Sequence, residues 1–499
     1  MNVDHVALAP AREAAEREAT PDPGRRGQGV VTVLVTYAVA AVTVWAMFSG
    51  YFIDEAVGVM ALALMLLLVL MQVHVGLAMV LCACLGMWAT QGDRAAVNLI
   101  RDLPYDAVAN WSLTVLPLFI FLGLLLWQSG LTTKLYAAGR EWLRWLPGGL
   151  AIGTNVAGAG MAAISGSTIG SSYALGRIGI PEMLKSGYDK RLVVFSVMSA
   201  GLPGQLIPPS IMMVIFAGIA EVPIGPQLMA GVGPGLLVLV MYSAGILVLG
   251  LVRPALVGGD HEQVLPAGTW RTKFASLGAI WLVPVIMLVV VGGIFTGFLT
   301  ASEAAAAGAG IALVACLAYR WRDKPLGAVK RAVLDTVEGA GSVFLVVIGA
   351  FAVADMLAVT GLGGAFTEWV TGLGLSSVSF LLVLFVGYLV LGTFIEPLPM
   401  MLMTVPLLMP VLEEMQISLQ WFGVFVVFMG ELAILTPPVG ILLYVLANMV
   451  KEKEVNVGVD ISLKDCTVAQ LWVLPLAFLV VLVLILFPGI ATTIPDLAG

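Results

Sequence analysis

The sequence predicts an all-α polytopic membrane protein made of two inverted repeats, each with a re-entrant hairpin and a broken helix. Of its 499 residues, 60% are hydrophobic and 11% are charged, whereas soluble domains average about 25% charged residues. The mean hydropathy is +1.03, and apolar runs of about 20 residues, the length that spans a bilayer, recur along the chain. Two of these runs contain a Pro-Pro pair, and the second pair follows the first by 229 positions (437 minus 208). This spacing indicates a long internal repeat.

The first pair, Pro208 and Pro209, lies inside the apolar run 192–220. Two adjacent prolines remove two amide donors and clash with the preceding turn, so a continuous helix cannot pass through them. In hydrocarbon each freed carbonyl needs a partner, and such a break must face protein, water or a bound ion. Taken alone, the motif fits a proline kink in an ordinary helix equally well. The second copy, inside the run 421–450, favours two broken helices.

Further landmarks keep nearly the same offset between the two halves. The Ser-Gly-Ser at 165–167 begins 44 residues before Pro209, and Phe394, in the stretch 392–397, lies 44 residues before Pro438. The remaining matches pair residues 129–131 with 360–362 and residues 141–142 with 368–369. The repeat therefore includes the segment before each break as well as the break itself.

Composition argues against several classes of function. The four cysteines and three histidines are scattered, and they form no Cys-x-x-Cys, metal cluster or nucleophile–base pair. The chain contains no Gly-x-x-x-x-Gly-Lys-Ser/Thr motif for nucleotides and no basic patch for nucleic acid. We therefore expect neither an enzyme nor an ATP-driven pump. The net charge of −7 says little, because the charges lie between the apolar runs.

The first repeat is predicted over residues 57–252. A polar tail, 1–29, and an extra N-terminal transmembrane helix, 30–56, precede it; the tail is not a signal peptide. Spans at 57–73, 75–90 and 113–127, a polar loop at 93–106 and a basic amphipathic surface helix at 132–145 lead to the hairpin. The apolar segment 148–180 is too short for two full spans, so we expect a re-entrant hairpin with residues 165–167 at its tip. The broken helix 192–220 and a span at 228–252 follow.

The second repeat is predicted over residues 276–450, after a cytoplasmic loop at 253–275. It contains spans at 277–298, 302–319 and 337–359, a surface helix at 363–371, a hairpin at 378–412 and the broken helix 421–450. Residues 451–499 form a cytoplasmic loop and the last transmembrane helix, at 471–487. The prediction is eleven spans and two hairpins.

The distribution of basic residues predicts the orientation. Arg140, Arg144, Lys185 and Lys190 flank the first hairpin, which places its ends on the cytoplasmic side. No Lys or Arg occurs between positions 331 and 451, so the second hairpin enters from the outside. The N-terminus is then cytoplasmic and the C-terminus periplasmic. Inverted repeats of this kind are typical of secondary transporters, which bind solute and ions near the midplane.

Several motifs resemble the large membrane subunit, DctM-type, of tripartite ATP-independent periplasmic (TRAP) transporters. They are Leu-Pro-Leu-Phe-Ile at 116–120, Ser-Gly-Ser at 165–167, Ile-Pro-Pro-Ser at 207–210, Ala-Gly-Val-Gly-Pro-Gly at 230–235, Thr-Ala-Ser-Glu-Ala-Ala at 300–305, and Glu431 with Leu-Thr-Pro-Pro-Val-Gly at 435–440. The likeness runs from about residue 57 to 490. The chain departs from the family pattern in its extra N-terminal helix, in Ala433 where the family has glycine, and in Glu396 where it often has aspartate.

The resemblance implies a sodium-coupled, elevator-type permease of the bacterial inner membrane. It would import an organic acid, such as a C4-dicarboxylate, sialic acid or a similar carboxylate, with Na⁺ as coupling ion and no other cofactor. The implied partners are a small four-helix membrane subunit (DctQ-type), a periplasmic solute-binding protein (DctP-type) and the lipid bilayer. An autonomous sodium/anion symporter of related fold is the alternative, and a non-transporting channel or scaffold subunit is a third hypothesis.

The resemblance also places two sodium sites, each between a hairpin tip and a helix break, where unwound backbone and hydroxyl groups supply oxygens. The first comprises Ser165, Ser167, Gly204, Ile207 and Pro209, and the second comprises Gly392, Thr393, Ala433, Thr436 and Val439. The candidate solute contacts are Ser165, Gly166, Ser210, Thr393 and Glu396. Tight helix packing by small residues is the alternative role for the serines. Glu303 is equally consistent with function and with a helix cap.

Overall fold

The computed structural model describes residues 23–258, 269–322, 324–437 and 440–498. Within these residues all regular secondary structure is helical, apart from one isolated bridge between Tyr188 and Val257. By length and composition, four helical segments are suited to cross a membrane, or up to seven if each of three sharply bent helix pairs is one span. The predicted all-helical membrane fold is confirmed, whereas the eleven spans and two re-entrant hairpins stay predictions.

From residue 23 onward, seven helices precede the first hairpin: α2 (Pro23–Met47), α3 (Asp54–Leu70), α4 (Val75–Gln91), α5 (Asp93–Val108), η1 (Trp111–Thr114), α6 (Val115–Gln128) and α7 (Leu131–Leu143). Residues 93–106, expected as a polar loop, form most of α5 instead. The reason is helical periodicity, since Ala96, Leu99 and Ala107 bury one face against α4 and α18 while the charged residues face outward.

The first hairpin consists of α8 (Gly149–Ser165) and α9 (Thr168–Lys185), which pack against each other. Gly166 and Ser167 form the turn, and Gly166 has a φ of +63°, a conformation that favours glycine. The first broken helix follows as α10 (Lys190–Ala200), η2 (Leu202–Gln205) and α11 (Ile211–Ile219). Helical structure stops just before Pro208, as the missing amide donors require.

The middle of the chain comprises α12 (Ile224–Ala230), α13 (Val232–Val252), η3 (Pro254–Leu256), α14 (Trp270–Ala279), α15 (Leu282–Met287), the π-helical turn η5 (Leu288–Gly292), α16 (Gly293–Phe295), α17 (Ala301–Tyr319) and α18 (Pro325–Thr360). The span expected at 277–298 is not straight, because α14 meets the segment Leu282–Phe295 at 56°. Pro284 explains the bend, since it cannot donate a hydrogen bond to the carbonyl of Ile280.

The second half of the chain is α19 (Leu362–Gly372), α20 (Ser377–Gly392), α21 (Pro397–Glu414), α22 (Leu419–Ala433), α23 (Ile441–Met449), α24 (Lys453–Asn456), α25 (Leu463–Leu486) and α26 (Gly489–Ala498). Helices α20 and α21 are joined by residues 393–396, and the Tyr388 and Thr404 hydroxyls lie 2.7 Å apart between them. Helices α22 and α23 are the two parts of the second broken helix. Its break spans residues 434–440, of which 438 and 439 lie outside the described residues.

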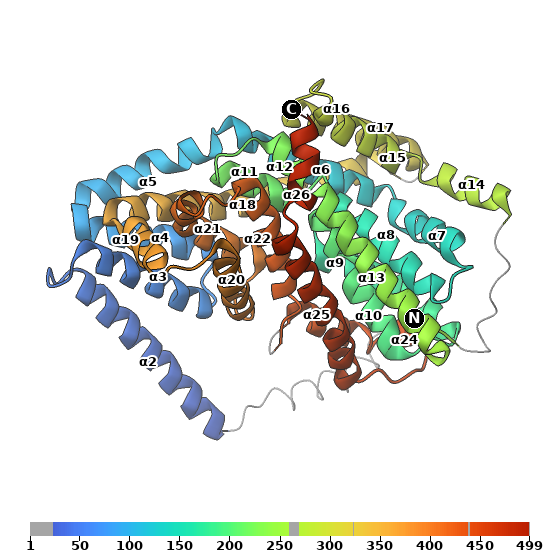
Figure 1. The fold of residues 1–499 in the computed structure, drawn as a ribbon, viewed down its shortest axis with the longest axis horizontal. Coiled ribbons are helices and arrows are strands. Elements are labelled where there is room, and N and C mark those ends of the chain that lie inside the picture. The colour runs from blue at the N-terminus through green and yellow to red at the C-terminus, as the bar shows by residue number, and fades with distance from the viewer. Residues whose placement is uncertain (1–22, 259–268, 323, 438–439, 499) are drawn as a thin grey trace, which may run out of the picture.

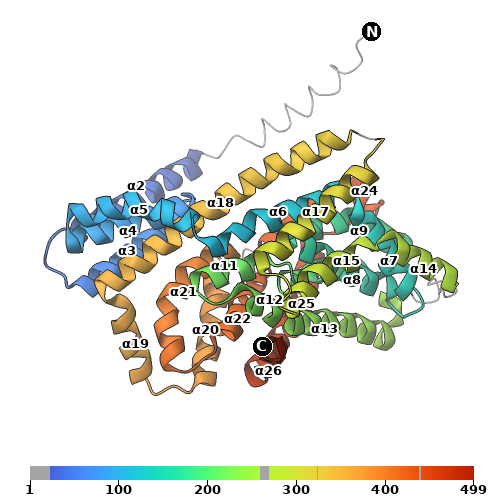
Figure 2. The ribbon, with the colours of Figure 1, turned by 90° about the horizontal axis from the view of Figure 1, so that it is seen from above.

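Helix α18 is the longest described helix, and it packs along α4, α6 and α17. Glycine allows the closest approach, because a Cβ on Gly76 of α4 would lie 2.6 Å from the carbonyl oxygen of Leu345 in α18. Figure 1 shows α3, α4, α5 and α19 grouped on one side and α7, α8 and α13 on the other, with α11, α12 and α22 between them. Figure 2 shows α18 running across the molecule beside this central group. The breaks therefore lie in the interior of the fold.

Candidate functional site

The first hairpin tip is tied to the first break by a buried amide. Ser167 caps α9, since its Oγ accepts a hydrogen bond from the Gly170 amide at 3.1 Å. The Gln205 Nε2 donates to the carbonyl of Gly166 at 2.8 Å and so bridges from η2 to the tip. Gly204 packs directly on α8, where an added Cβ would overlap Ala162. The tip and the break are thus held as one unit.

Backbone carbonyls of the first break are left without hydrogen bonds. Within the described residues, the carbonyls of Pro203 and Gln205 accept bonds, from the Leu206 and Ile207 amides and from the Ser210 hydroxyl. No hydrogen bond reaches the carbonyls of Gly204, Ile207 and Pro209 from this part of the chain. Unpaired carbonyls are the groups that an unwound membrane helix offers to a cation. The three predicted carbonyl positions of the first sodium site are compatible with that role.

The second tip and break are also in contact. Gly392 packs against Ala433, and a Cβ on this glycine would overlap the alanine. The Thr436 hydroxyl donates to the Leu432 carbonyl at 2.7 Å, and the Thr393 hydroxyl donates to the Leu389 carbonyl at 2.9 Å. Both hydroxyl oxygens keep their acceptor capacity, which is the property a cation needs.

Other carbonyls of the second break are already occupied. The Gln470 Nε2 donates to the carbonyl of Leu435, and the Leu442 amide donates to that of Ile434 at 3.2 Å. The Ala433 carbonyl accepts from the Thr436 amide at 3.2 Å, so it is partly satisfied already. Val439 lies outside the described residues. The second predicted site is therefore incompletely visible, and its role stays a prediction.

A buried hydrogen bond joins the first hairpin to the second repeat. The Thr168 Oγ1, at the start of α9, donates to the Glu431 Oε2 of α22 at 2.6 Å and lies 3.3 Å from the Gly201 carbonyl. Both side chains are buried, at 3% and 2% exposure. The first hairpin tip is thereby fixed to the second broken helix. Glu431 lies inside an apolar run, where a carboxylate is costly, but nothing in the sequence indicates Thr168 as its partner.

A pocket of about 420 Å³ lies where the two tips meet. The first tip contributes Gly166, Ser167 and Thr168, and the second contributes Glu396, Pro397 and Leu398. Further lining residues are Gln205, Glu431, Ile120 of α6, Gly339 and Val343 of α18, and apolar residues of α11 and of the second broken helix. No Lys, Arg or His is among its described lining residues, so an anion there would be met by the N-termini of α9 and α21.

The predicted solute contacts do not all border this pocket. Gly166 and Glu396 do, together with Ser167, which was predicted as a sodium ligand. Ser210 is fully buried as the cap of α11, accepting from the Met213 amide at 3.2 Å, and it is not among the pocket residues. Thr393 is buried and is also outside the pocket lining. The side chain of Ser165, the last residue of α8, lies outside what the structure describes.

Two further carboxylates from the sequence have other positions. Glu303 forms a capping box with Thr300 at the start of α17, in which each side chain bonds the other residue's backbone amide. The helix-cap alternative for Glu303 is therefore confirmed. Asp355 is exposed on α18.

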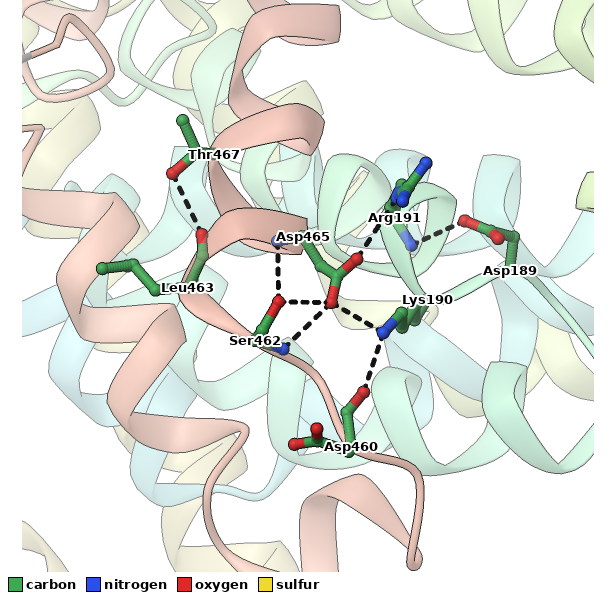
Figure 3. A network of polar contacts seen from close by, with 8 residues as sticks. All are labelled: Asp189, Lys190, Arg191, Asp460, Ser462, Leu463, Asp465 and Thr467. Carbon is green, nitrogen blue, oxygen red and sulfur yellow. Dashed lines mark hydrogen bonds and ion pairs between the residues drawn. The ribbon is translucent and has the colours of Figure 1, made fainter.

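An ion-pair network fixes the first broken helix to the last long helix. The Asp465 carboxylate, at the start of α25, accepts from the Lys190 Nζ at 2.7 Å and from the Arg191 Nε at 3.2 Å (Figure 3). It also caps its own helix through Ser462, and Lys190 bonds the Asp460 carbonyl at 3.0 Å. Only 6% of the Asp465 side chain is exposed. The network therefore holds α10 and α25 together at one end.

A multi-pass helical membrane protein whose two hairpin tips and two helix breaks meet at one pocket belongs to the class of transport proteins rather than enzymes. The family model for the DctM component of the tripartite ATP-independent periplasmic transporters matches residues 60–490 of this chain. Since this match covers most of the sequence, the protein belongs to that family, as its motifs predicted. It is a multi-pass protein of the bacterial inner membrane.

Individual relatives agree with this placement. The chain is 31% identical to the C4-dicarboxylate TRAP transporter large permease protein DctM of Pseudomonas aeruginosa, over 68% of this chain and 78% of the relative. It is 27% identical to the sialic acid TRAP transporter large permease protein SiaM of Vibrio cholerae, over 80% and 90%. Among solved structures, the Alcanivorax borkumensis YdaH transporter superposes with a TM-score of 0.55 over 81% of this chain and 90% of that chain. Its identity of 16% shows a shared fold alone.

Proposed function

We propose that this chain is the large permease subunit of a sodium-coupled TRAP transporter that imports an organic acid by an elevator movement. The observation that carries the proposal is the pocket between the two tips, walled on one side by α6 and α18. The Gln205–Gly166 and Thr168–Glu431 hydrogen bonds join the first hairpin to both broken helices. The packing of Gly392 on Ala433 joins the second hairpin to the second broken helix. The hairpins and broken helices form one block able to move past α6 and α18 as a unit.

Sodium coupling is supported by the backbone of the breaks. The carbonyls of Gly204, Ile207 and Pro209 and the hydroxyl of Thr436 provide oxygens next to the tips. The inverted topology, with the N-terminus cytoplasmic and the C-terminus periplasmic, belongs to the same proposal.

The solute is proposed to be a carboxylate. Relatives are named as permeases for C4-dicarboxylates, sialic acid, 2,3-diketo-L-gulonate and ectoine. The helix N-termini at the pocket suit a carboxylate group, since each carries roughly half a positive charge.

The partners are proposed from the family. A relative from Oleidesulfovibrio alaskensis is named as the permease protein DctMQ, and the match covers only 55% of its length, which suits a fusion of a large and a small subunit. We expect a separate DctQ-type small subunit and a DctP-type solute-binding protein to act with this chain.

Two experiments test the proposal. Tagged purification from native membranes should bring down a small four-helix membrane protein in near-equal amount. Recovery of the chain alone, with sodium-driven uptake by the chain alone, would instead establish an autonomous symporter. In the second experiment, Ser167→Leu and Thr436→Leu are each expected to abolish sodium-dependent uptake while the protein still inserts. Unchanged uptake by both variants would refute the site assignment.

A further inference from the structure

Gln205 is one of the residues that line the pocket, and its side chain has an unpaired hydrogen-bond acceptor. Its side chain is only 5% exposed, and it lies in η2 at the start of the first break. The Nε2 donates to the Gly166 carbonyl at 2.8 Å, which fixes the orientation of the amide. The Oε1 is buried and has no hydrogen-bond partner within the described residues. A buried acceptor without a partner is destabilising until a donor reaches it.

The polar groups around the pocket do not provide that donor. Glu396 and Glu431 offer acceptor oxygens, and the Thr168 hydroxyl already donates to Glu431. Ser167 also lines the pocket, and its Oγ serves as the acceptor for the Gly170 amide. The described lining contains no Lys, Arg or His. The pocket therefore has more acceptors than donors on the side of Gln205. At the tips, donors come from the N-terminus of α9 and, at α21, from the Leu398 amide, since Pro397 and Pro399 carry no N–H.

We propose that the Gln205 Oε1 accepts a hydrogen bond from a hydroxyl or protonated amino group of the transported solute. This inference rests on the proposed function, because it treats the pocket as the solute site. The carboxylate of the solute lies against the helix N-termini, and a neighbouring O–H or N–H group reaches Gln205. The permease then prefers hydroxylated or aminated carboxylates to their unsubstituted analogues, since a polar site rejects an analogue that leaves its buried group unpaired.

A sodium ion is the competing partner for this oxygen. Gln205 lies between Gly204 and Ile207, whose carbonyls are assigned to the first sodium site. The amide would then change the affinity for sodium and leave the choice among solutes unaltered. The two roles are separable by measuring both quantities in the same variant.

The test uses the whole transporter in proteoliposomes, with its small subunit and binding protein. Gln205→Met removes the amide at nearly constant volume. Gln227→Met is a matched control, because Gln227 is also buried, donates to the Gln420 carbonyl, has an unpaired Oε1 and is absent from the pocket lining. Malate and succinate are the first probe pair, since they differ by one hydroxyl. If the binding protein retains neither, an amino acid or hydroxy acid that it does retain and its unsubstituted analogue replace them.

We expect Gln205→Met to lower uptake of the hydroxylated or aminated solute about tenfold relative to its analogue, and Gln227→Met to leave this ratio unchanged. The binding protein is the same in every sample, so its own selectivity cancels. An unchanged ratio in Gln205→Met would overturn the proposal, as would an equal loss for both solutes with a raised half-saturating sodium concentration. If Gln205→Met does not insert into the membrane, the native transporter provides the test. Equal uptake of the substituted solute and its analogue, measured with the binding protein saturated, would also overturn the proposal. Absence of sodium-dependent uptake of any carboxylate by the native transporter would refute the proposed function instead.

Discussion

The buried bond between Thr168 and Glu431 makes a quantitative prediction about stability. Thr168→Val removes the hydroxyl at nearly constant volume and leaves the Glu431 carboxyl group, 2% exposed, without its only described hydrogen-bond donor. Leaving a buried polar group unpaired costs about 1–3 kcal/mol. A loss of about 2 kcal/mol lowers the apparent Tm by roughly 2–4 °C, because each kcal/mol shifts Tm less in a larger protein.

The matched control is Thr154→Val in α8. The Thr154 side chain is also fully buried, but its hydroxyl donates at 2.8 Å to the Leu150 carbonyl one turn earlier in the same helix. The Leu150 carbonyl keeps a backbone hydrogen bond of its helix when the threonine hydroxyl is removed. We therefore expect this variant to lose less than about 0.5 kcal/mol of its free energy of unfolding.

The double variant Thr168→Val with Glu431→Met gives the sharper test. It replaces both partners by apolar groups, and the orphaned carboxyl group disappears. We expect the double variant to regain at least half of the stability that Thr168→Val loses. Thermal unfolding at one scan rate in one detergent measures five proteins: the native chain, Thr168→Val, Glu431→Met, the double variant and Thr154→Val. Equal losses in Thr168→Val and Thr154→Val, or strictly additive losses in the double variant, would refute the reasoning.

Two further predictions concern packing and charge. Gly204→Ala places a Cβ against Ala162 and displaces the first break, so sodium binding to the purified protein should weaken at least about tenfold. The control is Gly341→Ala, whose added Cβ meets open space, and it should leave sodium binding unchanged. Equal sodium affinities in the two variants would contradict the close packing of Gly204. Asp465→Asn removes the negative charge and one of the two acceptor oxygens that two partly exposed basic residues and a helix cap share, so the protein should lose about 1–2 kcal/mol. The control is Asp460→Asn, which also removes one negative charge near the start of α25. Lys190 bonds only the backbone carbonyl of Asp460, so this variant keeps the network. Unfolding at the same temperature in both variants would argue against a stabilising role of the network.

The sequence predicted those parts of the fold that depend on local chemistry. The Pro-Pro pairs remove amide donors wherever they occur, so both breaks were found by inspection. Glycine and serine at 166–167 mark a turn between two helices for the same local reason. The capping box of Glu303 was among the alternatives because Thr300 lies three residues before it.

Contacts between distant segments were not predictable in the same way. Thr168 and Glu431 are 263 residues apart, and only the folded chain brings them to 2.6 Å. Gln205 looked like part of a break rather than of a pocket, since its neighbour Gly166 is 39 positions away. Helix α5 was missed for a different reason: its charged residues outweigh its apolar face in composition, and only a search for helical periodicity would have found it.

The length of α18 provides a scale for movement of the block. With 36 residues it is about 54 Å long, well beyond the roughly 30 Å of hydrocarbon in a bilayer. Even at a tilt of 40° it would project by about 10 Å, and the charged residues near its Pro325 end indicate which end emerges into water.

Gly339 and Val343 mark where the pocket stands along this helix in the present conformation. A displacement by one helical turn, about 5.4 Å, would bring Val346 or Val347 opposite the same tips. Each conformation of the proposed elevator thus places the tips opposite a different turn of α18. Disulfide crosslinking of cysteine pairs introduced in the tips and in successive turns of this helix would measure how far the tips move.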